Sequence, residues 1–129
     1  MLPGYACRSC HLGRNFLGQN PGGASQPEEA FSFSGTLYPG FHEADGCNAA
    51  PPATAVIEIL DNAGVVALTL RPNPVGNFYS NVAIPLPYTA RVNVNGAMRV
   101  MTTPQTEGDC NTCHTESGLS GAPGRIVSP

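Results

Sequence analysis

Charge is scarce in this 129-residue sequence. Charged residues make up 12% of it, and lysine and arginine together number six against nine acidic residues. The net charge of −3 gives no basic surface for nucleic acid, so nucleic acid is not an expected partner. No apolar run reaches the roughly 18 residues that a membrane-spanning helix needs, so no membrane span is expected. Basic residues are also too few for an electrostatic membrane anchor.

Glycine and proline, by contrast, are abundant, with 15 and 13 copies. This composition favours strands, turns and ordered loops over long helices. A chain of this length is expected to form one domain, with a core that is only moderately well buried.

A Cys-x-x-Cys-His pattern occurs twice, once near each end of the sequence. The two copies are Cys7, Cys10, His11 and Cys110, Cys113, His114. This spacing is that of the attachment site for a c-type haem, in which each thiol adds across a vinyl group and the imidazole binds iron. The copies account for four of the five cysteines and two of the three histidines. We therefore expect two covalently attached haem c groups, with His11 and His114 as iron ligands.

A zinc site is the main alternative, and disulfides are the second. Two Cys-x-x-Cys pairs brought together form a four-thiolate zinc site, in which a free His11 or His114 could replace a thiolate. Such a site has no use for a histidine directly after each pair, whereas haem attachment requires one. The haem interpretation is therefore preferred.

Between the motifs the hydrophobic pattern changes to a period of two, which is typical of strands. At the start of this region Phe33 and Leu37 fall on one face and Ser34 and Thr36 on the other, which predicts a half-buried strand. The predicted strands cover residues 31–37, 55–59, 66–70, 77–84, 88–94 and 97–102.

The pair Asn95-Gly96 is the strongest hairpin signal in the sequence. A two-residue turn at this point sets Val92 opposite Arg99 and predicts that Met101 faces the core, while Met98 faces outward.

About six short strands with tight turns predict an all-β fold, namely a small antiparallel β-sandwich with haem-binding loop segments at both termini. We expect an N-terminal haem-binding segment at 1–30, a β-sandwich core at 31–104 and a C-terminal haem-binding segment at 105–129. The core resembles transthyretin-like, carboxypeptidase-regulatory-type β-sandwiches, a resemblance that implies a fold and not a function. It is carried by Ser34-Gly35-Thr36, Ala55-Val56-Ile57, Asp61-Asn62-Ala63-Gly64, Gly76-Asn77-Phe78 and Pro87-Tyr88-Thr89-Ala90-Arg91-Val92.

His42 is the only histidine outside the motifs, so we expect it to be an axial ligand of one of the two irons. If six strands alternate in direction, both termini lie at one end of the sandwich and His42 at the other. His42 could then ligate a haem of a neighbouring copy of the chain. The other iron is left with Met98, Met101, the Met1 terminus, a side chain of a partner or an open site, although core packing is the commoner fate of methionine.

Three further residues have open interpretations. Cys47 is unpaired, which suggests an intermolecular bond or a buried free thiol, with a metal site shared with His42 as a weaker alternative. Arg8 and Arg125 are expected to be exposed, with pairing to a haem propionate as the alternative.

Taken together, the motifs resemble those of dihaem c-type cytochromes, which implies electron transfer and not catalysis. Haem attachment of this type implies export to a periplasmic or extracellular location, although no export signal is visible in the chain. Expected partners are redox proteins or extracellular electron acceptors. A haem motif near each terminus resembles the plan of extracellular polymeric cytochrome filaments, and a homo-oligomer or head-to-tail homopolymer is therefore expected. The alternatives are a monomeric carrier, a dihaem peroxidase-like enzyme with an open coordination site, and a zinc-stabilised binding module.

Overall fold

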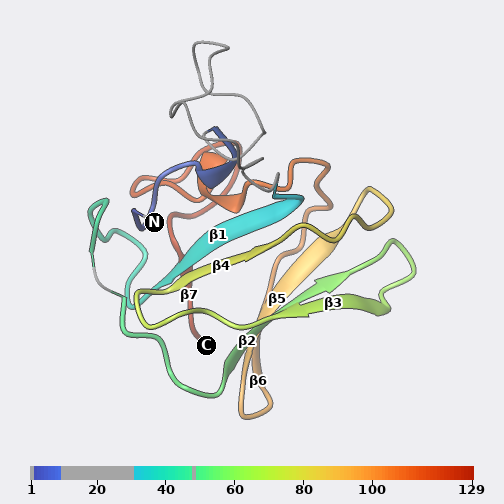
Figure 1. The fold of residues 1–129 in the computed structure, drawn as a ribbon, viewed down its shortest axis with the longest axis horizontal. Helices are drawn as coiled ribbons and strands as arrows, with labels where there is room; N and C mark the ends of the chain where they lie inside the picture. Colours follow the sequence, from blue (N-terminus) through green and yellow to red (C-terminus); the bar gives the residue numbers. More distant parts are fainter. Residues whose placement is uncertain (1, 10–30, 48) are drawn as a thin grey trace, which may run out of the picture.

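The computed structural model describes residues 2–9, 31–47 and 49–129. They form two packed sheets, as expected for a small β-sandwich (Figure 1). The first sheet has the order β4-β1-β7 and the second the order β3-β2-β5-β6. The described residues form seven strands: β1 (Phe33–Tyr38), β2 (Ala55–Leu60), β3 (Val66–Leu70), β4 (Asn77–Ser80), β5 (Thr89–Val94), β6 (Ala97–Val100) and β7 (Ile126–Val127). In the part of the chain that the structure describes, no helix has the length and apolar character of a membrane span.

The predicted hairpins are present in the second sheet. The turn between β2 and β3 is stabilised by Asp61, whose side chain accepts hydrogen bonds from the backbone N–H groups of Ala63 and Val65, each at 2.9 Å. Between β5 and β6, Asn95 and Gly96 have φ angles of 53° and 89°, as the tight turn requires. This turn pairs Val92 with Arg99, so the predicted register is confirmed.

Two strand predictions need correction. The strand predicted at 77–84 ends at Ser80, since only Asn77–Ser80 pairs with β1. The sequence also gave no signal for β7, which is two residues long and pairs in parallel with β1 through Leu37 and Ile126. Such a short strand cannot display a period of two.

The prediction that β1 is half-buried is wrong. All six residues of β1 are buried, including Ser34 and Thr36 on the face that was expected to meet solvent. The reason is that the terminal segments cover this strand. The hydroxyl of Thr36 accepts a hydrogen bond from the N–H of Gly4 at 3.0 Å and donates one to Asn77 Oδ1 at 2.8 Å, so its polar group is satisfied without water.

The two terminal segments lie side by side over β1. Each contains one turn of 3₁₀-helix at its cysteine motif, η1 (Cys7–Ser9) and η2 (Cys110–Thr112), drawn in blue and orange in Figure 1. The backbone N–H of Arg8 donates to Asp109 Oδ2 at 2.7 Å, which joins the two segments directly. The two motif segments are therefore neighbours in the structure.

Candidate haem-binding site

The C-terminal motif lies in a loop whose two ends both pair with β1. Before the motif, Ser34 donates its N–H to Gly108 O at 2.9 Å, and after the motif Ile126 pairs with Leu37. Residues 110–125 therefore leave the edge of β1 and return to it. Both ends of the loop that carries the C-terminal motif are held by the sandwich core.

Asn111, which lies between the two cysteines of the motif, forms hydrogen bonds with β1 between these two pairing points. Its Oδ1 accepts the N–H of Thr36 at 3.0 Å, and its Nδ2 donates to Thr36 Oγ1 at 3.1 Å and to Tyr5 O at 2.8 Å. One buried amide thus connects the C-terminal motif to β1 and to the N-terminal segment. Sequence reasoning missed this residue, because an Asn at a variable position of the motif gives no signal of its own.

The turn η2 brings the backbones of the three motif residues close together. The N–H groups of Cys113 and His114 both donate to Cys110 O, at 3.2 and 2.9 Å. Gly35 of β1 makes room for this turn, because a Cβ there would lie 3.1 Å from Cys110 Cβ and 2.5 Å from the ring of Phe78. Close approach of the motif to β1 therefore depends on a glycine in the strand.

The imidazole of His114 is oriented as an iron ligand requires. Its Nδ1 lies 2.8 Å from Gly124 O, and because a carbonyl can only accept, Nδ1 carries the proton and donates it. Burial lowers the pKa of His114, which favours the neutral ring. Nε2 is then the unprotonated nitrogen, with its lone pair free to bind a metal.

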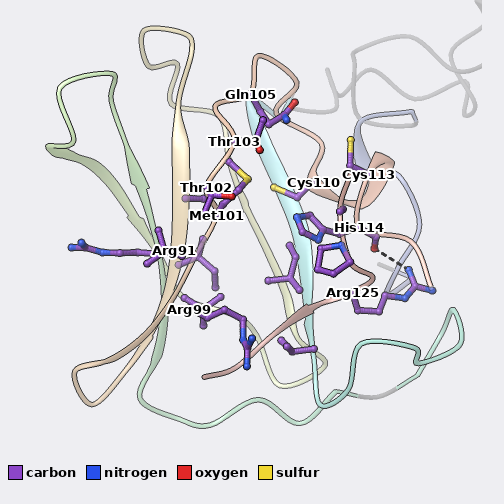
Figure 2. A pocket seen from close by; sticks show the side chains of 18 of the residues that line it. Arg91, Arg99, Met101, Thr102, Thr103, Gln105, Cys110, Cys113, His114 and Arg125 are labelled. Atoms are coloured by element: carbon purple, nitrogen blue, oxygen red, sulfur yellow. Dashed lines mark hydrogen bonds between the residues drawn. The ribbon is translucent and has the colours of Figure 1, made fainter. Parts of the chain in front are cut away.

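A cavity of about 290 Å³ lies beside this histidine, with walls from both sheets. Cys110, Cys113 and His114 all line it, and Figure 2 shows His114 among them. Apolar side chains form much of the rest of the wall, namely Ile57, Phe78, Val92 and Ile126. Two thiols, a neutral imidazole and apolar walls are the donor set and surroundings that a covalently attached porphyrin needs.

The thiol of Cys110 is suited to a thioether more than to a thiolate. Burial raises its pKa to about 12, with the charge of Asp109 adding to the effect. A thioether carries no charge, so attachment of a haem at Cys110 would place no charge in this apolar setting.

Of the N-terminal motif the structure describes Cys7, while Cys10 and His11 lie outside the described residues. Cys7 is partly buried, and burial together with the charge of Asp109 raises its pKa. Among the described residues, no group of three or more His, Cys, Asp and Glu side chains is placed to hold a metal ion.

Arg125 corrects the expectation of an exposed arginine. It is 2% exposed, forms an ion pair with Asp45 and lies over the ring of Tyr38 at 4.8 Å. Its side chain also donates to Glu43 O at 2.9 Å and to His114 O at 3.4 Å (Figure 2). Arg125 thus ties the loop after β1 to the haem motif. Arg8 also forms an ion pair, with Glu107, so both guanidinium groups have carboxylate partners.

His42 lies beside the C-terminal motif but does not reach its cavity. Its Nδ1 is 2.8 Å from Glu116 O, and the residue is exposed and is not part of the cavity wall. The expectation that His42 lies at the opposite end from both motifs is therefore wrong. That argument ignored the loop after β1, which folds back so that Phe41 O accepts the N–H of Arg125 at 2.8 Å.

Cys47 is partly buried in the same loop, with its thiol 3.5 Å from a carboxylate oxygen of Glu43. Burial and the neighbouring Glu43 carboxylate raise the pKa of Cys47, which keeps it as a thiol.

Comparisons with protein-family models, with curated proteins and with solved structures give no match to this chain. The site geometry and the β-sandwich therefore carry the functional argument.

Proposed function

We propose that the protein is an exported dihaem c-type cytochrome that transfers electrons and has no substrate turnover of its own. The observation that carries the proposal is the arrangement around His114. Its Nδ1 is fixed by Gly124 O, its Nε2 is free, and the thiols of Cys110 and Cys113 line the same cavity. Haem bound here would supply a one-electron couple between ferric and ferrous iron.

The protein's own contribution is to hold and orient. Gly124 O fixes the plane and tautomer of His114, and the cavity walls exclude water from one side of the site. The N-terminal motif is expected to hold a second haem through Cys7, Cys10 and His11. Because Arg8 and Asp109 join the two motif segments, the two cofactors of one chain are expected to be neighbours. This favours electron transfer within the chain before transfer to a redox partner or extracellular acceptor.

The test is a count of covalently bound haem by pyridine haemochrome, with oxidised and reduced visible spectra. We expect two haems per chain in the unmodified protein and one in the double variant C110A/C113A. The variant C47A is the matched control, since Cys47 is outside both motifs, and should keep two. A colourless protein that binds zinc would overturn the proposal in favour of the zinc-stabilised module. A high-spin haem with peroxidase turnover would favour the enzyme.

A second candidate, polymerisation into an electron-conducting filament, is favoured by His42. Its Nδ1 is held by Glu116 O while the ring is exposed, so its Nε2 is available to an iron outside the cavity described here. A neighbouring copy could supply that iron, which would make His42 an assembly contact. Sedimentation of the haem-loaded protein tests this. A monomer at all concentrations, with both haems six-coordinate, would contradict it.

A further inference from the structure

The cavity beside His114 has two walls that come from different parts of the fold. His114 belongs to the loop whose two ends pair with β1, in the first sheet. Facing it is the second sheet, where Met101 follows β6 and donates its N–H to Ala90 O of β5 at 2.8 Å. Both side chains line the cavity, and in Figure 2 they are attached to these two different segments. Both side chains would therefore be available to a cofactor held in this cavity.

The strand register selects Met101 over Met98. Met98 is paired with Asn93 and is 48% exposed, so it faces solvent. Met101 is partly buried and packs against the core cluster that contains Ile57 and Phe78. Of the two methionines, Met101 lines the cavity and Met98 does not.

The other ligand types in the cavity wall are already engaged. Tyr88 donates its hydroxyl to Glu107 O at 2.6 Å, and burial raises its pKa far above the ordinary value, which keeps it protonated. Glu107 pairs with Arg8, and Asp109 accepts the N–H of the same residue. The sequence contains no lysine. Apart from the motif's own residues, Met101 is the one uncharged soft donor in the described wall.

We propose that Met101 is the sixth ligand of the iron bound by His114. This inference rests on the proposed function, because it needs haem at Cys110 and Cys113. It gives the C-terminal site histidine–methionine ligation, which raises the reduction potential above that of a bis-histidine site. It also leaves His42 free for another iron.

The test compares M101L, M101H and M98L with the unmodified protein, each loaded with haem. The unmodified ferric protein should show the weak red absorption band of methionine bound to haem iron. M101L should lose the band completely and gain a high-spin component from one haem, while M98L should keep the band at full strength. M101H should restore a low-spin spectrum without the band, and its potential at one haem should fall below that of the unmodified protein.

Two outcomes separate this inference from the proposed function. Absence of covalent haem in the unmodified protein would contradict both the proposed function and the role of Met101. Two haems per chain, with the same ferric spectrum and the same two potentials in M101L as in the unmodified protein, would overturn the role of Met101 alone. Recovery of the low-spin spectrum in M101H excludes misfolding as the cause of the change in M101L.

Discussion

His42 and His114 make the same hydrogen bond in different surroundings. Each places Nδ1 2.8 Å from a backbone carbonyl, Glu116 O for one and Gly124 O for the other, and each leaves Nε2 free. Yet His114 is partly buried and lines a cavity with two cysteines, whereas His42 is exposed. The hydrogen bond prepares an imidazole to be a ligand, and the surroundings decide which iron it can meet. Under the proposed function, His114 would serve an iron in its own cavity, while His42 could serve only one that approaches from outside.

Replacing each of the two histidines in turn is the most direct test of this difference. H114A should cause the largest change, because the C-terminal iron loses its fixed ligand, and one of the two haems should become high-spin or be lost. H42A should keep two covalently bound haems, since His42 contributes no thiol and lies outside the cavity. Haem counting and ferric spectra of the two variants provide the measurement. If H42A changed the haem count or the ferric spectrum of a monomeric sample as much as H114A does, the different roles assigned to the two histidines would be contradicted.

The second prediction concerns the carbonyl that holds His114. Gly124 has φ 137°, and a Cβ there would lie 2.4 Å from Phe41 O, next to His42. G124A should therefore disturb both histidine regions and lower the free energy of unfolding by about 3 kcal/mol, from backbone strain and overpacking together.

The matched control for this change is G64A. Gly64 has φ 77° in an exposed turn, and no atom lies within 4 Å of the position of a Cβ. Its cost should be only that of the left-handed backbone, about 1 kcal/mol. Urea unfolding measures both variants. Equal losses would show that the contact between Gly124 and Phe41 is unimportant.

The smallest expected effect is a dependence of the protein's stability on pH. Burial holds the pKa of His114 below the ordinary value of 6.5, so the unfolded chain binds this proton at a higher pH than the folded chain does. The stabilisation is present in full above about pH 6.5 and is lost as the pH falls from there through the folded pKa. In the haem-free protein, where Nε2 of His114 can take up a proton, urea midpoints measured at pH 7.5 and pH 5 should therefore differ, with the lower value at pH 5. H114Q should reduce this difference.

The sequence predicted the features that are encoded locally. The Asp61 turn and the Asn95-Gly96 hairpin were correctly placed, and the hairpin predicted the correct register with Met101 toward the core, whereas the period of two overextended the strand at 77–84. The cysteine motifs point to the candidate site because their chemistry depends on spacing along the chain.

Features that depend on distant segments could not be predicted in the same way. The burial of Thr36, the short β7 and the position of His42 all arise where terminal segments fold back over β1. Arg125 was misjudged for the same reason, because its partners Asp45 and Glu43 are far from it in sequence. Counting strands to place His42 failed because a loop can reverse direction without a strand.

The pairing of Leu37 with Ile126 has a consequence for folding. The central strand of the first sheet lacks one neighbour until a segment far along the sequence joins it, and contacts between such distant segments form slowly. Until that contact forms, the loop that carries the C-terminal cysteine motif is tied to β1 only at its first end, through Ser34 and Gly108. The parallel pair therefore closes this loop and fixes the motif in its place.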